Sequence, residues 1–404
     1  MNRTKIAVIG TVGIPAKYGG FETLADHLVE ELSGDVDFTV YCTKKKYAKD
    51  QRPATYKGAK LVYLPFDANG IQSIVYDCIS ILHAMFFADV LLILGVSGGI
   101  MLPFVRLFTR KKIIISIDGI EWKRNKWSKA ARLYLFAAEW LAVKFSHADI
   151  SDNESIQDYT AIRYKTLSHI IEYGADHTIA VKPTQADKEK YAFLNKPYAF
   201  KVCRIEPENN IHIVTEAFAK LPKHTLVIVG NWNNSEYGKE LKEKYKHFSN
   251  IHLLDPIYNQ RELDLLRGNC LVYVHGHSAG GTNPSLVEAM YLGLPIVAFG
   301  VNYNKTTTEH QAFYFKTADE LENIISTTKI ADLKKKAAEM KDIADRRYTW
   351  KVIAKKYAFL AEKVLRSSSK SALVPKATQK IPKRKLLQQE LGHLQNPSLF
   401  FEKR

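Results

Sequence analysis

Residues 5–28 read KIAVIGTVGIPAKYGGFETLADHL, a short apolar run followed by a glycine-rich turn and a helical pattern. The apolar run is continuous rather than alternating, which indicates a strand buried on both faces. The turn at residues 10–20 carries four glycines. Units of this kind build parallel sheets, and ligands bind beyond the carboxyl ends of their strands.

The same order of elements recurs along the first half of the chain. Strands are predicted at residues 5–10, 37–43, 60–65, 89–94, 112–117 and 147–151. Helical patterns between several of them fall at residues 20–33, 72–87, 126–145 and 154–162.

A second series of the same kind follows a polar, proline-bearing stretch. Its strands are predicted at residues 199–205, 225–230, 251–255, 271–275 and 295–299. Its helices are predicted near residues 210–220, 235–247, 259–267, 284–292, 331–345 and 350–365. Alternating strands and helices predict parallel sheets with helices on both sides. The predicted fold class is therefore α/β: two tandem Rossmann-like doubly wound domains with an interdomain cleft and a closing C-terminal helix.

The sequence predicts five segments. They are an N-terminal domain at 1–180, a linker at 181–197, a C-terminal domain at 198–348, a closing helix at 349–365 and a basic tail at 366–404. The tail carries nearly half of the net charge, and its serines and prolines are typical of a mobile extension. A dispensable tail and a membrane anchor are both open interpretations of it.

The composition excludes several classes of protein. The chain has 404 residues, of which 46% are hydrophobic and 25% charged, with a net charge of +16. Neither wholesale disorder nor an acidic solvating protein fits these values. The positive charge favours anionic partners: phosphate-bearing substrates, an anionic membrane surface or nucleic acid.

The cysteines, the first residues and the apolar stretch at 88–108 indicate in which compartment the protein is expected. The four cysteines form no CxxC pair, which argues against a disulfide framework or zinc ribbon and fits a reducing cytoplasm. The first residues lack the pattern of a signal peptide. The apolar stretch at 88–108 is broken by GVSGG at 95–99, which favours a buried strand, turn and helix over a membrane span. A surface that touches a membrane is the third interpretation.

Two strand ends in the first half carry candidate binding groups. Gly19 and Gly20 precede the first helix, where the backbone can approach an anion closely, although a plain glycine turn is the alternative. Asp118 and Glu121 follow the strand KIIISI, and Asp118 is a candidate catalytic carboxylate. The basic and aromatic segment at 122–134 suits either membrane-surface docking or a core helix with a solvated basic face.

The second half carries the stretch HGHSAGGTNPSLVEAM at 275–290, directly after a predicted strand. Asn283 is a favourable N-cap, and backbone amides from Gly280 onward can converge on a phosphate there. Glu288 lies one turn farther on, where a carboxylate can face a sugar or ribose hydroxyl. Arg204 ends the strand at 199–205 and suits phosphate recognition, with a surface ion pair to a nearby glutamate as the alternative.

Together these motifs resemble the GT-B glycosyltransferases of family 4, which are retaining nucleotide-sugar transferases. EAMYLGLPIVAF (288–299) is similar to that family's glutamate helix and the strand after it. GTVGIPAKYGGFETLADHL, DGIEWKR, VCRIEPENNIH and GGTNPSLVEAM resemble a bacterial subgroup of rhamnosyltransferases that build capsule, O-antigen or exopolysaccharide. The resemblance covers residues 3–365.

The resemblance implies roles for the candidate residues. Glu288 is expected to bind the nucleotide ribose, and Arg204 with the helix after Asn283 to hold the diphosphate and stabilise its charge as it leaves. Gly19 and Gly20 are expected to close over the diphosphate. The acceptor is expected near Asp118 and Glu121. Alanine at Glu288 or Arg204 is expected to cut transfer while leaving the fold intact.

The chain departs from the family at two positions. The first glutamate of the family's two-glutamate motif falls on Gly280, and a lysine that often follows the phosphate arginine falls on Asn209. The candidate replacements for these contacts are His277, Thr282 and the backbone amides of Gly280 and Gly281.

The implied reaction is transfer of L-rhamnose from dTDP-rhamnose to a polyprenyl-diphosphate-linked saccharide. The enzyme is then cytoplasmic and peripheral on the inner face of the cytoplasmic membrane. Neither a cofactor nor a metal is expected, since His275 and His277 lack a third ligand at suitable spacing. UDP- or GDP-linked donors, an acceptor-free epimerase and a catalytically weak scaffold stay open. Nucleic acid is not an expected partner.

Overall fold

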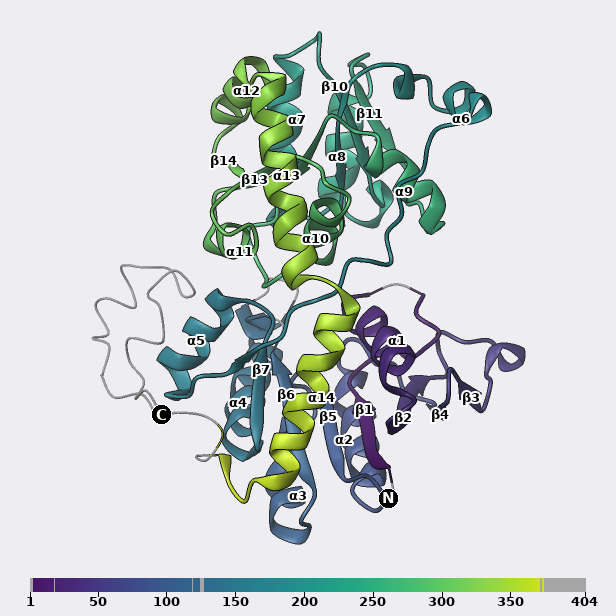
Figure 1. Ribbon diagram of the computed structural model, residues 1–404, viewed down its shortest axis with the longest axis vertical. Coiled ribbons are helices and arrows are strands. Elements are labelled where there is room, and N and C mark those ends of the chain that lie inside the picture. Colours follow the sequence, from purple (N-terminus) through teal and green to yellow (C-terminus); the bar gives the residue numbers. More distant parts are fainter. Residues whose placement is uncertain (1–2, 18, 118, 124–126, 371–372, 374–404) are drawn as a thin grey trace. The chain divides into compact units, whose positions relative to one another are not determined.

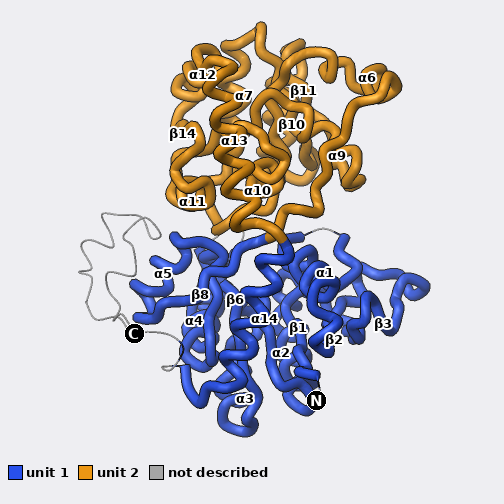
Figure 2. Tube along the Cα trace, viewed as in Figure 1, with its two compact units in different colours: residues 1–173, 350–404 blue, residues 174–349 orange. Residues whose placement is uncertain are grey.

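The computed structural model describes residues 3–17, 19–117, 119–123, 127–370 and 373, and it divides the chain into two compact units (Figures 1 and 2). Unit 1 comprises residues 1–173 and 350–404, and unit 2 comprises residues 174–349. Each unit holds one sheet with helices packed on both faces.

The sheet of unit 1 has the strand order β3-β4-β2-β1-β5-β6-β7-β8. All neighbours are parallel except β3 and β4. The strands are β1 (Thr4–Ile9), β2 (Val36–Thr43), β3 (Thr55–Tyr56), β4 (Ala59–Leu64), β5 (Val90–Leu94), β6 (Lys112–Ile117), β7 (Ala148–Ser151) and β8 (His169–Ile170). The central strands β1, β5 and β6 are buried along most of their length, as their continuous apolar runs predict.

Crossover direction decides which face each helix of unit 1 covers. The helices are α1 (Gly20–Leu32), α2 (Gln72–Ala84), α3 (Leu102–Phe108), α4 (Lys129–Phe145), α5 (Glu154–Tyr164) and α14 (Trp350–Arg366). The chain moves from β1 to β2 in one direction and from β4 through β7 in the other. Right-handed crossovers therefore put α1 on one face and α2, α3 and α4 on the opposite face. The last helix, α14, joins α1 and shares a hydrophobic cluster with it.

Unit 2 repeats this plan with the all-parallel strand order β11-β10-β9-β12-β13-β14. Its strands are β9 (Tyr198–Val202), β10 (Thr225–Val229), β11 (Ile251–Leu254), β12 (Val272–His275), β13 (Ile296–Phe299) and β14 (Phe313–Phe315). Its helices are α6 (Gln185–Lys190), α7 (Ile211–Ala219), α8 (Glu236–Tyr245), α9 (Gln260–Gly268), α10 (Pro284–Tyr291), α11 (Asn302–Thr307), α12 (Ala318–Thr327) and α13 (Ile330–Arg347). Two hydrophobic clusters, one on each face, fill the unit.

The strands and long helices expected from the sequence are present in both units. The structure adds elements too short for a periodic signal, among them β3, β8, β14 and α6. The segment at 181–197, expected as a linker, lies within unit 2 and forms α6 and a 3₁₀ turn. The segment at 88–108 forms β5, a turn and α3, and none of the helices in the described ranges is long and apolar enough to cross a membrane.

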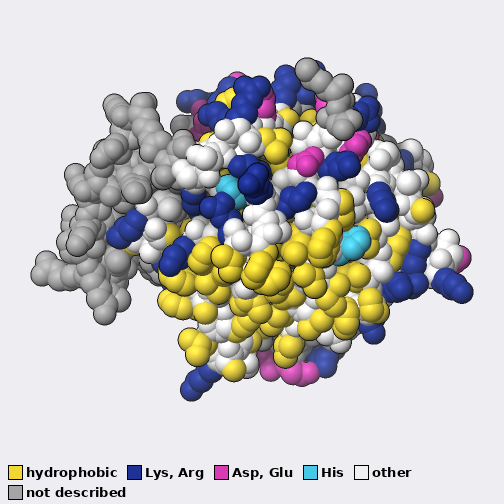
Figure 3. Space-filling view, turned by 90° about the horizontal axis from the view of Figure 1, so that it is seen from below, with side chains coloured by type: hydrophobic (Ala, Val, Ile, Leu, Met, Phe, Trp, Pro, Cys, Tyr) yellow, Lys and Arg dark blue, Asp and Glu magenta, His cyan; other side chains and the backbone are white. Residues whose placement is uncertain are grey.

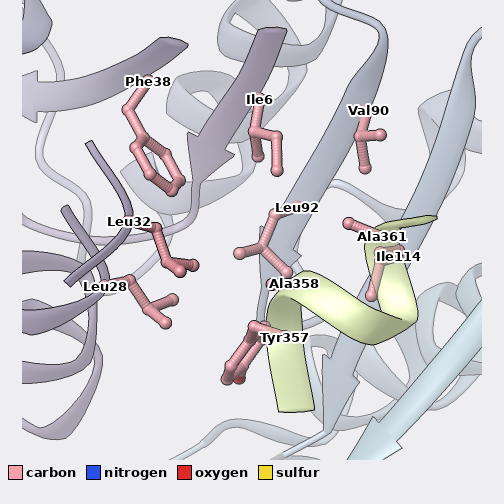
Figure 4. A pocket seen from close by; sticks show the side chains of 10 residues that line it. All are labelled: Ile6, Leu28, Leu32, Phe38, Val90, Leu92, Ile114, Tyr357, Ala358 and Ala361. Atoms are coloured by element: carbon pink, nitrogen blue, oxygen red, sulfur yellow. The ribbon is translucent and has the colours of Figure 1, made fainter. Parts of the chain in front are cut away.

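A small apolar pocket lies in unit 1 between the sheet and the helices α1 and α14 (Figure 4). Its lining comes from strand residues such as Ile6 and Leu92 and from helix residues such as Leu28 and Tyr357. A ligand site needs a few placed polar groups to orient its ligand, and this lining offers almost none. The pocket is therefore a gap in core packing and not a candidate substrate site.

The chain remains anchored beyond the end of α14. Lys370 Nζ forms an ion pair with Asp149 Oδ1 at 2.5 Å and donates to Val143 O at 2.5 Å. The Asp149 side chain is fully buried on β7. The expected mobile tail at 366–404 thus includes a fixed contact at Lys370, whereas residues 371–372 and 374–404 lie outside the described residues.

Replacing Lys370 with methionine is expected to lower the free energy of unfolding by about 3 kcal/mol, because it leaves the buried Asp149 carboxylate without its cation. Chemical denaturation measures this change. Lys355→Met, on the exposed side of α14, is the matched control and should stay within about 0.5 kcal/mol of the wild type. Equal unfolding energies for the two variants would show that the ion pair contributes nothing.

Candidate functional site

In each sheet the second strand along the chain lies on one side of the first strand, and later strands are added on its other side. In unit 2, β9 lies between β10 and β12, and in unit 1, β1 lies between β2 and β5. Doubly wound sheets bind ligands at such switch points, beyond the carboxyl ends of the strands. The candidate groups follow these strands: Arg204 follows β9, Asn283 ends the loop after β12, and Gly19 ends the loop after β1.

The loops after β9 and β12 are joined to each other by hydrogen bonds. Asn210 Nδ2 donates to Gly276 O at 2.9 Å, and the backbone N and Oγ of Ser278 each donate to Glu208 O at 2.9 Å. A Cβ atom at Gly276 would lie 2.3 Å from the carbonyl oxygen of Asn209, so this close approach requires glycine. The predicted residues of unit 2 are thereby brought to one edge of the sheet.

The N-terminus of α10 has the predicted cap. Asn283 Oδ1 accepts hydrogen bonds from Ser285 N at 3.1 Å and from Ser285 Oγ at 2.8 Å, and Pro284 is the first helical residue. Gly280 has a φ of +117°, and a Cβ atom there would meet nothing within 4 Å. The backbone before α10 is therefore open on one side, and Thr282 is buried beside it.

Arg204 is exposed on the loop after β9. Within the described residues its guanidinium forms no ion pair with Glu206 or Glu208, which removes the alternative interpretation of this residue. Its carbonyl oxygen accepts from Asn209 Nδ2 at 2.6 Å and from Glu206 N at 3.0 Å. A positive side chain on a fixed loop, with no competing carboxylate, is suited to an external phosphate.

Asn209 is almost fully buried. Its Nδ2 group holds the Arg204 carbonyl, and its Oδ1 atom has no protein hydrogen-bond partner in the part of the chain that the structure describes. The structure therefore shows Asn209 as a residue that shapes the Arg204 loop. His277 lies on the neighbouring loop, where its carbonyl accepts from Asn304 Nδ2 at 2.9 Å.

Glu288 lies on α10, and both of its carboxylate oxygens have partners. Oε2 accepts from the buried guanidinium of Arg267, and Oε1 lies 3.2 Å from His177 Nε2. Arg267 also pairs with the buried Asp264 at 2.8 Å. Burial acts to raise the pKa of Glu288, but Arg267 and His177 outweigh it and bring the pKa down to about 2. The carboxylate is thus ionised at neutral pH and keeps lone pairs to accept a hydroxyl hydrogen bond.

Sequence reasoning missed a buried cation at this edge. Lys201 on β9 is 1% exposed, and its Nζ atom has no hydrogen-bond partner among the described residues. A Cβ atom at Gly276 would lie 2.7 Å from that Nζ. Burial lowers the pKa of Lys201 and, with the charge of Lys201, holds the pKa of His275 well below its ordinary value. The one sequence signal is a lysine inside the apolar run AFKVCRI.

Replacing Lys201 with methionine is expected to raise the free energy of unfolding by about 1–3 kcal/mol at pH 7, because it removes a buried polar group without a partner. The folded pKa of Lys201 lies below the unfolded value of 10.5, so protonation disfavours the folded state. The gain should therefore be largest below the folded pKa and fall, as the pH rises through 10.5, to the smaller contribution of the neutral, unpartnered amine. Denaturation at several pH values measures it. A gain that does not change with pH would contradict this account.

Two carboxylates of α1 accept hydrogen bonds from backbone N–H groups of the loop between β1 and α1. Glu22 Oε1 accepts from Val12 N at 2.7 Å, and Asp26 Oδ2 accepts from Ala16 N at 2.8 Å. Burial raises the pKa of Glu22, although the hydrogen bonds that Glu22 accepts from Val12 and Thr11 act to lower it. Gly19 has a φ of +134°, and a Cβ atom there would lie 1.9 Å from Glu22 Oε2. Glycine is thus required at position 19 by the loop itself, which is the plain alternative considered for it.

The remaining candidates in unit 1 follow β6. Asp118 lies outside the described residues, so its predicted role is still a prediction. Glu121 begins the 3₁₀ turn Glu121–Lys123, and its Oε1 accepts from Trp127 Nε1 at 2.9 Å. Trp122 Nε1 donates to Tyr159 at 2.8 Å, and Tyr134 donates to Ser97 O at 2.5 Å. The polar ends of these aromatic rings are thus bonded within the unit.

Among the described residues, no group of three or more histidine, cysteine, aspartate or glutamate side chains is arranged to hold a metal ion. His275 and His277 stack with ring centroids 4.5 Å apart.

Two protein-family models match parts of this chain. Residues 183–347 match the model of the family described as Glycosyl transferases group 1. Residues 3–176 match a second model, described as a domain of unknown function, DUF1972. No curated protein matches the chain.

Solved structures resemble this chain in fold at low sequence identity. Sucrose-phosphate synthase from Thermosynechococcus elongatus aligns over 90% of this chain and 99% of its own, with a TM-score of 0.73 and 16% identity. Anabaena HepE in complex with UDP-glucose aligns over 89% and 100%, with a TM-score of 0.67 and 17% identity. Trehalose 6-phosphate synthase from Burkholderia multivorans aligns over 90% and 99%, with a TM-score of 0.68 and 12% identity. These likenesses confirm the expected GT-B fold class.

Proposed function

We propose that this group 1 glycosyltransferase is a retaining enzyme of family 4 that transfers L-rhamnose from dTDP-rhamnose. The proposed acceptor is a polyprenyl-diphosphate-linked saccharide at the inner face of the cytoplasmic membrane, in the synthesis of a bacterial surface polysaccharide. The sugar, the acceptor and the location rest on the resemblance of four sequence motifs to the rhamnosyltransferase subgroup.

The observation that carries the donor site is the arrangement at the switch point of unit 2. There the exposed guanidinium of Arg204, which pairs with no carboxylate of the described residues, and the open N-terminus of α10 follow neighbouring strands. Arginine and helix N-termini both favour phosphate. Glu288, ionised and one turn into α10, supplies an acceptor for a ribose hydroxyl. One edge of one sheet thus offers the groups that a nucleoside diphosphate needs.

The proposed step breaks the bond between the anomeric carbon and the phosphate oxygen and forms a bond from the acceptor oxygen to the same carbon. The electron pair of the broken bond goes to the leaving diphosphate. Arg204 and the amides before α10 stabilise that charge, which is the main contribution to the rate. The acceptor attacks from the face that the phosphate leaves, so the configuration is retained, and the leaving phosphate takes the acceptor proton. No side chain is assigned as a covalent nucleophile.

The two departures from the family pattern have local substitutes in this proposal. Gly280 leaves the backbone open where the family has a glutamate, so amides of Gly280 and Gly281 and the Thr282 side chain are proposed to contact the sugar and diphosphate. The amine of Lys201 lies buried under the same loops, where Asn209 replaces the family's lysine. The chain itself supplies all of these groups, and the proposal includes no metal or cofactor.

A UDP-linked donor is the second candidate. Its support is the likeness to HepE, whose structures include complexes with UDP and with UDP-glucose. The pocket that discriminates thymine from uracil is set by a few contacts, and resemblance of motifs does not fix them. The nucleotide base must therefore be varied in the test.

The test is a transfer assay with radiolabelled dTDP-rhamnose, UDP-glucose and GDP-mannose, each with membranes that carry polyprenyl-diphosphate saccharides. The expected result is label in the lipid extract with dTDP-rhamnose alone. Label from UDP-glucose or GDP-mannose alone keeps the transferase and rejects rhamnose. No label from any donor, with nucleotide binding intact, would favour the scaffold alternative over the proposed enzyme.

A further inference from the structure

The exposed apolar side chains of the molecule gather on one face of unit 1. Eleven of the sixteen large apolar side chains that are exposed among the described residues lie between positions 71 and 140. We call their surface the α2–α4 face; its members are Ile71, Val75, Leu82, Phe86, Ile100, Phe104, Leu107, Phe108, Leu133, Phe136 and Trp140. Figure 3 shows apolar side chains as a continuous area on this side of the protein.

The face is continuous because its helices pack side by side. α2, α3 and α4 all cover the same face of the sheet, and the short turn Gly99–Met101 contacts each of them. α3 shows why the surface stays apolar: it buries Leu102 and Val105 against the unit and exposes Leu107 and Phe108 at 76% and 63%. A helix that is apolar on both sides needs a second apolar partner.

The exposed charge on helices α2, α3 and α4 has one sign. The carboxylates within α2, α3 and α4 are Asp77 and Glu139, and both are buried. The exposed charged groups on these helices and directly after α3 are basic, including Arg110, Lys129 and Lys144. Lys144 Nζ lies 4.5 Å from the ring centroid of the exposed Trp140, so a cation and an apolar group adjoin. In Figure 3, Lys and Arg side chains border most of the apolar area, and a few acidic side chains adjoin its lower edge.

We infer that the α2–α4 face docks this protein on an anionic lipid bilayer. Apolar side chains with a basic border suit the interface between acyl chains and anionic headgroups. A second copy of the chain fits less well, because a two-fold interface places the same patch on both sides and sets basic residues against basic residues. A contiguous apolar surface exposed to water also marks an interaction site in general.

This inference deepens the proposed function, on which it rests for the lipid-linked acceptor. It also changes which residues meet the membrane. Membrane docking was one of two interpretations of the segment at 122–134, but Trp122 and Tyr134 are bonded within the unit. Leu133, Phe136 and Trp140 of α4 are exposed in their place, together with side chains of α2 and α3.

The test is flotation of the full chain with vesicles of phosphatidylcholine containing 30% phosphatidylglycerol, and with vesicles of phosphatidylcholine alone. The wild type should float with the anionic vesicles, and the bound fraction should fall in high salt. The double variant Leu107→Glu with Phe108→Glu should lower the partition coefficient at least tenfold. Phe359→Glu is the matched control, since Phe359 is 59% exposed on α14, across the sheet, and it should float like the wild type.

Three results would overturn the inference. The first is wild-type flotation of the double variant at an unchanged melting temperature. The second is equal binding to neutral vesicles. The third is a dimer of the wild type in light scattering that the double variant abolishes. Hydrolysis of the nucleotide-sugar donor, measured without vesicles, separates this test from the test of the proposed function. If the protein is the proposed transferase, the double variant should hydrolyse the donor at the wild-type rate. If the proposed function is wrong, neither the wild type nor any variant should hydrolyse the donor.

Discussion

Replacing Arg204 with alanine is expected to lower kcat for sugar transfer about 10²–10³-fold, which is the usual cost of removing one preorganised donor to a developing negative charge. Arg204 is an exposed cation on the loop after β9, without an ion-pair partner among the described residues, beside the loop that leads to α10. Its interaction strengthens as charge builds on the leaving diphosphate, so the loss should fall mainly on kcat. Initial rates at saturating donor measure it.

The fold should not change in this variant. Arg204 makes no ion pair in the described part of the chain, and a surface substitution of this kind changes the unfolding free energy by less than about 0.5 kcal/mol. Arg204→Lys should recover part of the rate because it restores charge without the planar fork. Arg261→Ala, an exposed arginine on α9, is the matched control and should transfer at the wild-type rate. Near wild-type transfer by Arg204→Ala would remove this residue from the site.

Replacing Glu288 with glutamine is expected to cost about 3 kcal/mol of unfolding free energy at pH 7. The pKa of Glu288 falls from an ordinary 4.5 to about 2 in the folded chain, and a pKa difference of one between the folded and unfolded states is worth about 1.4 kcal/mol. A lowered folded pKa gives stability that is present above the unfolded pKa and is lost as the pH falls through the folded pKa. The difference between variant and wild type should therefore be complete above about pH 4.5 and vanish near pH 2.

The same substitution should weaken transfer, since it removes the ionised acceptor proposed for the ribose. Alanine at Glu288 is a poorer choice for this test. Sequence reasoning expects it to leave the fold intact, yet the structure shows that Glu288 neutralises the buried Arg267. Glu240→Gln, on the exposed side of α8, is the matched control for denaturation at different pH values. A stability difference that does not depend on pH would contradict the ion-pair account.

Much of the fold could be predicted because the signal was local and repeated. The continuous apolar runs at β1, β5 and β6 and the Asn-Pro start of α10 each identify an element from a few neighbouring residues. The parallel pairing of the strands followed from the alternation of strands and helices. Elements of two or three residues, such as β8 and β14, carry too few residues for any period to be recognised.

The partners of the candidate site could not be predicted in the same way. Arg267 reaches Glu288 from the end of α9, and His177 reaches it from a loop 111 positions away. No spacing rule links such residues before the sheet is assembled. Lys201 was overlooked because a lone lysine in an apolar run is read as a strand residue. The α2–α4 face was only partly anticipated, by the third interpretation of residues 88–108, because apolar periodicity in a helix does not tell which apolar residues stay exposed.

The most direct test of the donor site is a calorimetric titration of the full chain with dTDP, UDP and GDP, with the matching nucleosides as controls. The account predicts that one diphosphate binds, that its nucleoside binds far more weakly, and that Arg204→Ala weakens the diphosphate at least tenfold. Equal affinity of wild type and Arg204→Ala for that diphosphate, or no binding of any of the three, would contradict a donor site at the switch point of unit 2.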